Sequence, residues 1–465
     1  MNTLGGDKMA MTDKKKGELI EKGIKVVTSG NAPVTLNYLI SDAGGQGDVY
    51  HVSFRGHDYA MKWYCKNADD VIGGLQYDTI SKICGDDKRP SDKFVWPLFL
   101  VTEENPCEGK QFGYLMELLP KNYYEMNDYL RMDGDPSAVR FKSYNAMLVA
   151  GMNIAYAMQK LHLKGYSYKD LNPKNFALNP DNGDALIIDN DNVSVDNDKC
   201  TVKGMKGYMA PEIPRSKYRL SPTIETDYYS LAIILYRLFF VDHPMDGKLW
   251  EKVALCTDEV EEFLYSLKPV FHFDPKNESN RPTEVYAPNA IFRWRAMPQE
   301  IRKLFIGAFT EGINHPGKRS PEGVWINTIA KCRDKLIRLN AEREQFVNFD
   351  DARSVPPRCL GIKIGGHRVA LYPQKAIYQI SVDGNHHQFG TIMAGITYNK
   401  QLDSLMIRNM TDKTWRGWSP NTKQLTDIPG GKEYPIFPGV MIEFQREGER
   451  TARIIGEIFD AKVKQ

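Results

Sequence analysis

Apolar and polar positions alternate in short runs between Val34 and Glu117, which is the period of half-buried β-strands. β-Branched and aromatic residues fill these runs, which read VTLNYLI, DVYHVSF, HDYAMKWY, KFVWPLFLV and FGYLMELL. One weak helical stretch, from Ala68 to Cys84, interrupts them. Because Gly-rich or polar turns separate the runs, we expect an antiparallel sheet here.

The apolar period changes to that of a helix from Ser143 onward. The first helical stretch, SYNAMLVAGMNIAYAMQKLHLKG, ends at Gly165. Further helices are expected at residues 226–240, 258–266, 298–309 and 321–339. The middle of the chain is therefore predicted to be helical.

Strand alternation returns after Cys359, behind a polar stretch that ends in Pro356-Pro357. Turn signals such as Gly365-Gly366 separate the later strands, so a small all-β sandwich is expected. The expected strands read CLGIKIGG, HRVALY, AIYQISV, DSLMIRNM, VMIEFQR and ARIIGEIF. The predicted parts are a tail at 1–33, a β-rich part at 34–119, a helical part at 120–339, a linker at 340–358 and the sandwich at 359–465.

The net charge, the cysteine spacing and the length of the apolar runs exclude several classes of protein. The formal net charge of +2 provides no strong field to attract nucleic acid or an anionic membrane. The seven cysteines are scattered and never form a CxxC pair, which argues against disulfides and zinc and fits a reducing cytosol. No apolar run follows the N-terminal lysines, and the run at 228–241 is too short to span a bilayer. We expect a cytoplasmic protein that binds neither nucleic acid nor a membrane.

A Gly-rich segment, DAGGQGDVYHV at 42–52, lies between two expected strands. Glycines let backbone N–H groups approach phosphates closely, although an ordinary hairpin turn would read the same way. Lys62 lies on the next strand among apolar neighbours. Since a buried lysine needs an anionic partner, a nucleotide phosphate behind the Gly-rich segment would supply one.

A second group of polar residues follows in YSYKDLNPKN at 166–175 and LIIDND at 186–191. Asp170 and Asn175 lie five positions apart, and Asp189 ends an apolar strand. Each acid alone would read as a turn residue. Together they supply a carboxylate to orient an acceptor hydroxyl and oxygen ligands for Mg²⁺, as phosphoryl transfer requires.

With YMAPE at 208–212, these motifs resemble the eukaryotic-like protein kinase family in their order along residues 34–339. The resemblance implies an α+β, bilobed protein-kinase fold with a β-rich N-lobe and a helical C-lobe, followed by the β-sandwich. It implies ATP and Mg²⁺ as cofactors and a protein as substrate. The implied activity is an ATP-dependent protein kinase acting on Ser or Thr, with Tyr left open.

The resemblance also assigns roles to individual residues. Asp170 would be the catalytic base, Lys62 and Lys174 would act with it, and Asn175 and Asp189 would hold Mg²⁺. Asp227 would anchor the catalytic loop, and Arg319 would pair with Glu212. The residues implied in nucleotide binding are Gly44, Gly47, Val49, Ala60, Lys62, Glu117 and Leu119, with Met116 as gatekeeper.

A narrower resemblance is carried by AMKWY, FVWPL, GYLMEL, DNDNVSV, HPMDG, FDPKNESNRP, AFTEGINHPGKR and RNMTDKTW. These segments are similar to bacterial Ser/Thr kinases of tellurite-resistance-type gene clusters, which can end in a forkhead-associated-like domain. That resemblance implies a phosphatase or other proteins of the gene cluster as partners. For residues 359–465 it leaves two readings: a docking or regulatory domain, or phosphopeptide recognition with Asn409 and Thr411 as candidates.

Departures from the kinase pattern leave alternatives open. The triplet at 189–191 is Asp-Asn-Asp, Tyr168-Lys169 replaces the usual His-Arg, and Met205 replaces a Thr. No helical Glu is evident to pair with Lys62, and Asp70, Asp78 or Leu75 would lie nearest that place. A pseudokinase that binds nucleotide as a scaffold is the main alternative. A small-molecule phosphotransferase is a third reading, which YMAPE argues against.

Overall fold

The computed structural model describes residues 15–42, 47–64, 71–105, 111–131, 135–198, 204–340, 343–356, 359–444 and 454–462. The chain divides into two compact units. Unit 1 comprises Met1–Lys142, Ala157–Ala290 and Ile306–Arg319, and unit 2 comprises Ser143–Tyr156, Ile291–Phe305 and Ser320–Gln465. Helices α4 (Tyr144–Leu163), α8 (Pro288–Ala296) and α9 (Gln299–Phe309) contribute residues to both.

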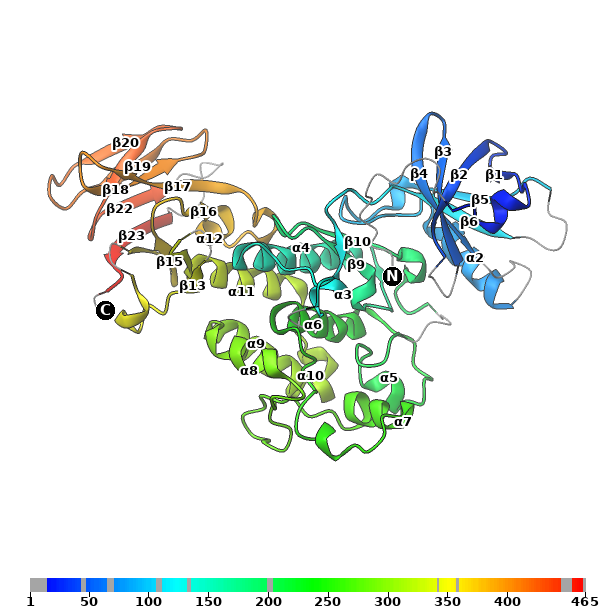
Figure 1. Ribbon diagram of the computed structural model, residues 1–465. Coiled ribbons are helices and arrows are strands. Elements are labelled where there is room, and N and C mark those ends of the chain that lie inside the picture. The colour runs from blue at the N-terminus through cyan, green and yellow to red at the C-terminus, as the bar shows by residue number, and fades with distance from the viewer. Residues whose placement is uncertain are drawn as a thin grey trace. The chain divides into compact units, whose positions relative to one another are not determined.

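The N-terminal part of unit 1 is a closed barrel with strand order β1-β2-β3-β4-β6-β5, drawn in blue and cyan in Figure 1. Its interior is filled by alternate residues of the strands, such as Val52, Met61 and Leu115, all completely buried. The strands are β1 (Val26–Thr28), β2 (Pro33–Ser41), β3 (Gly47–Phe54), β4 (His57–Tyr64), β5 (Phe99–Glu103) and β6 (Phe112–Met116). The five runs expected from the sequence correspond to β2–β6.

The tail assigned to residues 1–33 was too long. Helix α1 (Glu18–Glu21) and strand β1 lie within it, and β1 pairs with both β2 and β5 to close the barrel. Strand β1 is only three residues long, so it shows no alternation to count. Pairing on both edges is what stabilises so short a strand.

The rest of unit 1 is mainly helical. Helix α6 (Ile224–Phe240) begins at a capping box between Thr223 and Thr226 and carries the most apolar run of the chain into the core. The other helices are α2 (Val71–Ile83), α3 (Met126–Tyr129), α5 (Glu212–Arg215), α7 (Asp258–Glu262) and α10 (Glu311–Asn314). Short strands β7 (Tyr124–Glu125), β8 (Tyr166–Ser167), β9 (Phe176–Leu178), β10 (Ala185–Ile187) and β11 (Ser194–Val195) complete it. No helix of the described residues is long and apolar enough to cross a membrane.

Unit 2 contains two antiparallel sheets that share an apolar core. One has the order β15-β14-β23-β22-β19-β20 and the other β16-β17-β18-β21. Ile362 and Ile458 of the first sheet and Ile377, Ile396 and Ile407 of the second belong to one buried cluster. The strands are β14 (Leu360–Ile364), β15 (His367–Leu371), β16 (Ala376–Tyr378), β17 (Ile392–Asn399), β18 (Ser404–Asn409), β19 (Trp415–Trp418), β20 (Leu425–Ile428), β21 (Glu433–Ile436), β22 (Met441–Phe444) and β23 (Ile454–Asp460).

Two local expectations for this region differ from the structure. The run AIYQISV was expected as one strand, but β16 ends at Tyr378 and α12 (Gln379–Asp383) follows, closed by Gly384 at φ 72°. The segment expected as a linker contains β13 (Glu344–Phe346), which pairs with β12 (Leu336–Arg338) directly after α11 (Glu322–Lys335). Its residues Val347, Phe349 and Val355 are buried, because they join a small cluster with Ala370 and Phe459.

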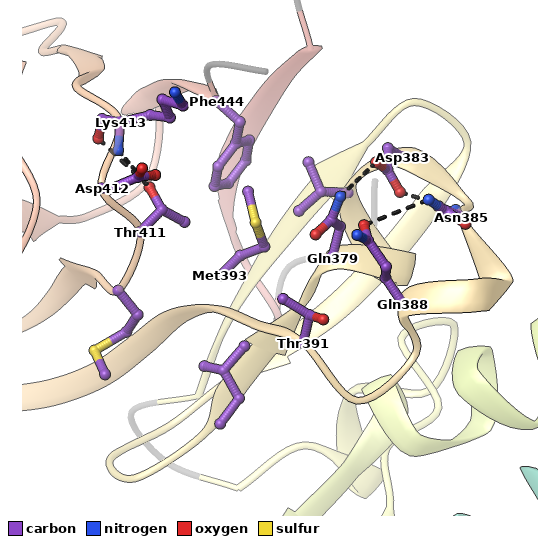
Figure 2. A pocket seen from close by; sticks show the side chains of 13 residues that line it. Gln379, Asp383, Asn385, Gln388, Thr391, Met393, Thr411, Asp412, Lys413 and Phe444 are labelled. Carbon is purple, nitrogen blue, oxygen red and sulfur yellow. Dashed lines mark hydrogen bonds between the residues drawn. The ribbon is translucent and has the colours of Figure 1, made fainter. Parts of the chain in front are cut away.

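A cavity of about 630 Å³ opens at one end of these sheets. Figure 2 shows Asp383, Asn385 and Gln388 on one side of it and Thr411 and Lys413 on the other. Met393 and Phe444 supply apolar surface to the lining. The cavity therefore offers both polar and apolar contacts.

Candidate active site

Strand β4 carries Lys62 into the interior of unit 1. Val49 of β3 lies opposite Lys62, and Gly47 lies opposite Tyr64. A Cβ atom at Gly47 would lie 2.0 Å from the backbone oxygen of Trp63, so the close approach of β4 itself requires glycine here. Gly44 lies outside the described residues.

The expected adenine-binding residues flank this strand. Ala60 is buried and pairs with Met116 at the end of β6. Glu117 and Leu119 follow directly, and the carboxylate of Glu117 is exposed and binds the guanidinium of Arg89. The side chain of Glu117 is thus directed to a cation, which leaves its backbone as the part that can contact a base.

The carboxylate of Asp227 holds the backbone of the loop that carries Asp170. The carboxylate of Asp227 accepts hydrogen bonds from the backbone N–H of Tyr168 at 2.6 Å and of Lys169 at 3.1 Å. The Nε2 atom of His162 lies 3.1 Å from the same carboxylate. The anchoring role expected for Asp227 is confirmed.

Asp170 and Asn175 are joined within this loop. The Nδ2 atom of Asn175 donates to the backbone oxygen of Asp170 at 2.9 Å, so the Oδ1 atom of this amide is the group that can serve as a metal ligand. The side chain of Asn172 also donates to that backbone oxygen, at 3.0 Å. Burial raises the pKa of Asp170 to about 6, while the hydrogen bond from Asn172 and the charge of Lys174 act in the opposite direction. Lys174 itself is exposed beside the loop.

Asp189 follows strand β10 in the left-handed region, at φ 57° and ψ 57°. Two hydrogen-bond donors tie its loop to the loop that carries Asp170. The N–H of Ile188 donates to the backbone oxygen of Asn175 at 2.9 Å, and the hydroxyl of Tyr168 donates toward the backbone oxygens of Ile188 at 2.7 Å and Asp189 at 3.0 Å. Asp170, Asn175 and Asp189 are thereby brought together.

Among the described residues, two carboxylates contact the ammonium of Lys62. One is Asp189, and the other is Asp191, whose Oδ2 atom lies 2.7 Å from Nζ. Asp78 is exposed on α2, Leu75 is exposed as well, and Asp70 lies outside the described residues. The sequence interpretation therefore missed Asp191, and the signal available was a second acid two positions after Asp189.

The charges of Lys62, Asp189 and Asp191 shift one another's pKa values. Burial by itself would lower the pKa of Lys62, but the charges of Asp191 and Asp189 raise it above its usual range, so the ammonium is retained. Partial removal of the Asp189 carboxyl from water, with the charge of Asp191, raises the pKa of Asp189 to about 6. Asp191 is also buried, which opposes ionisation, yet the charge of Lys62 and hydrogen bonds from Lys62 and Tyr64 lower its pKa overall.

Hydrogen bonds and an ion pair hold the segment after Asp189 at its two ends. The ammonium of Lys169 donates to the hydroxyl of Ser194 and, at 2.9 Å, to the backbone oxygen of Asp198. At its far end, both Nη atoms of Arg319 donate to the carboxylate of Glu212 at 2.7 Å. The predicted pairing of Arg319 with Glu212 is confirmed.

The donor set fits a nucleotide with a divalent cation. Lys62 supplies a cation for phosphate oxygens, while Asp189 and Asn175 supply the oxygen ligands that Mg²⁺ prefers. Within the described ranges no three His, Cys, Asp or Glu side chains gather as a metal-binding group. A magnesium ion held by these residues would neutralise charge on the transferred phosphoryl group.

Comparison with known proteins bears directly on this geometry. Residues 106–305, which include the loop of Asp170 and the loop of Asp189, match the family model for the protein kinase domain. This stretch of the chain is similar to protein kinase domains. The match begins after β5, so it does not include Val49, Ala60 or Lys62.

Individual relatives are protein kinases as well. The chain is similar to Calcium-dependent protein kinase 27 of Arabidopsis thaliana, at 32% identity over 248 residues that cover 46% of this chain and 46% of the relative. Calcium-dependent protein kinase 6 of Plasmodium berghei is 30% identical over 172 residues, covering 36% of this chain and 10% of the relative. Serine/threonine-protein kinase sck2 of Schizosaccharomyces pombe is 29% identical over 127 residues, covering 26% and 19%.

The chain spans less than half the length of each of these three relatives. Among solved structures, the ROP18 kinase domain in complex with AMP-PNP and sucrose superposes with a TM-score of 0.43 at 16% identity, covering 64% of this chain and 79% of that one.

Proposed function

We propose that this protein kinase domain transfers the γ-phosphoryl group of ATP to a Ser or Thr hydroxyl of a protein, with Tyr as a further acceptor to test. The observation that carries the proposal is the convergence of Lys62, Asp189 and the Asp170–Asn175 loop, although Lys62 and Asp189 lie 127 positions apart. Similarity to Ser/Thr protein kinases supports the choice of acceptor.

The roles of the residues follow from their positions. Asp170 would orient the acceptor hydroxyl and accept its proton, and exposed Lys174 lies where it can balance charge beside that carboxylate. Lys62 would bind the α- and β-phosphates, and Asp189 with Asn175 would hold Mg²⁺. Val49, Ala60, Glu117 and Leu119 would enclose the adenine, with Gly44 and Gly47 over the phosphates.

The Asp170→Asn variant tests the assignment. The amide cannot accept the proton, so transfer to a generic protein acceptor should fall by ~10²–10⁴-fold while nucleotide affinity changes little. Asp78→Asn, the same change at an exposed acid on α2, is the matched control. Near-normal transfer by Asp170→Asn would refute the role of Asp170. Wild-type protein that binds Mg·ATP but phosphorylates neither itself nor the acceptor would instead favour the nucleotide-binding scaffold.

For residues 359–465 we propose a docking or regulatory role, in line with the resemblance to forkhead-associated domains. The cavity in Figure 2 supports it, because exposed Ile392 and Met410 lie beside polar side chains in its lining. The Ile392→Arg and Met410→Arg double variant should retain transfer to a short peptide and lose transfer to a full-length acceptor found by co-expression with gene-cluster proteins. Equal loss on both acceptors would contradict a docking role. A phosphatase or other cluster protein as partner remains a prediction.

A further inference from the structure

The two carboxylates that contact Lys62 differ sharply in exposure. The side chain of Asp189 is 39% exposed, whereas that of Asp191 is 0% exposed. Both reach the same ammonium, which is itself only 9% exposed. Solvent and a dissolved cation can therefore reach Asp189 directly but cannot reach Asp191.

Two side chains of β4 hold the carboxylate of Asp191 in place. The hydroxyl of Tyr64 donates to the Oδ2 atom of Asp191 at 2.6 Å, and Lys62 donates to the same atom at 2.7 Å. Lys62 and Tyr64 are two positions apart on one strand, so their side chains leave it on the same face. The carboxylate is thus bound by two donors that belong to one element of a closed barrel.

The backbone of Asp191 is also held in place, by contacts within and around its own loop. It lies in the 3₁₀ turn Asn190–Asn192, whose Asn190 is completely buried. The Nδ2 atom of Asn190 donates to the backbone oxygens of Val95 at 2.8 Å and Ile187 at 3.0 Å. These bonds leave the backbone beneath Asp191 little freedom to move.

We propose that Asp191 is the positioning residue for Lys62: it holds the ammonium in place when Asp189 turns from Lys62 to a metal ion. This inference rests on the proposed function. A buried ammonium left without any anion beside it would be strongly destabilised, so Asp189 can turn to a cation more readily when a second anion stays with Lys62. Asp191 provides that anion from the buried side, without requiring a carboxylate from α2.

The test compares Asp191→Asn with Asp189→Asn by calorimetric titration of a nonhydrolysable ATP analogue, with and without Mg²⁺. Asp191→Asn should weaken binding tenfold or more under both conditions and keep the increase in affinity that Mg²⁺ produces, because it acts through Lys62. Asp189→Asn should lose that increase. Asp78→Asn, an exposed acid on α2, is the control and should match wild type.

A double-mutant cycle shows whether Asp191 acts through Lys62. In a Lys62→Met background, Asp191→Asn should weaken nucleotide binding less than twofold further. Additive losses, or loss of the Mg²⁺ increase in Asp191→Asn, would overturn the proposal, and the latter would make Asp191 a metal ligand.

A milder variant covers the case in which Asp191→Asn does not fold. Tyr64→Phe removes one donor to the carboxylate and should weaken nucleotide binding by less than tenfold, equally with and without Mg²⁺. No effect of Tyr64→Phe would count against the proposal. Failure of the wild-type protein to bind nucleotide at all would instead remove the proposed function.

Discussion

The hydroxyl of Tyr168 donates to the backbone oxygen of Asp189 at 3.0 Å, which joins the loop of Asp170 to the backbone of the residue expected to bind a metal ion. Asp189 adopts left-handed backbone angles that an L-residue takes at some energetic expense. Tyr168 is completely buried, so its hydroxyl has no water to compete for this bond. Tyr168, at the position where the kinase pattern has His, thus holds the loop of Asp170 to the backbone that carries Asp189.

The pH dependence of transfer should report Asp170. Because burial raises the pKa of its carboxyl to about 6, and the base must be ionised to accept a proton, kcat/KM should be level above that pH. Below about pH 6 it should fall by at least tenfold per unit, because the carboxyl of Asp170 is protonated there and so is that of Asp189, whose pKa is also raised to about 6. Initial rates from pH 4.5 to 8 measure this. An acid limb near pH 4 would mean that Asp170 is solvated like an ordinary carboxyl.

Activity should depend little on phosphorylation of the segment after Asp189. Strand β11 pairs with β8, with Ser194 opposite Ser167, and Lys169 already binds Ser194, so ordinary contacts hold the start of the segment. Ser194→Ala with Thr201→Val should keep transfer within tenfold of wild type. Thr201 lies outside the described residues. A larger loss, restored by Ser194→Asp, would reveal a phosphorylation switch.

The buried pair of Arg319 and Glu212 should be important for stability. The side chain of Arg319 is 2% exposed, and removing it leaves Glu212 with its charge largely uncompensated. Arg319→Met should therefore lower the free energy of unfolding by about 3 kcal/mol in denaturant titrations. Lys318→Met, its exposed neighbour, should change the same quantity by less than about 0.5 kcal/mol. Equal effects would show that the pair contributes nothing specific.

The full chain should bind phosphothreonine peptides no more tightly than their unphosphorylated forms. Asn409 is completely buried, and its Nδ2 atom donates to the backbone oxygens of Lys413 at 2.6 Å and Ile428 at 2.8 Å. Its Oδ1 atom accepts from the N–H of Thr411 at 2.9 Å. Asn409 therefore braces its own loop. A tenfold preference, about 1.4 kcal/mol, that disappeared in Arg408→Ala would overturn this prediction.

Much of the fold could be read from periodicity. The apolar runs around Lys62 and in α4 and α6 gave the right elements, because residues 60–64 of β4 and most of α6 are buried in the core. Strand β1 and the burial of the 340–358 segment were not predicted from the sequence pattern. Their burial depends on partners that are distant in sequence.

The sequence by itself determined the order of Lys62, Asp170, Asn175 and Asp189, since the chemistry of phosphoryl transfer requires those groups at those spacings. Only the tertiary structure decided which anion accompanies Lys62. Asp191 lies 129 positions away and differs from Asp189 by nothing that a sequence shows. The two acids acquire different environments because the 3₁₀ turn places one against Tyr64 inside the barrel wall and leaves the other accessible to solvent.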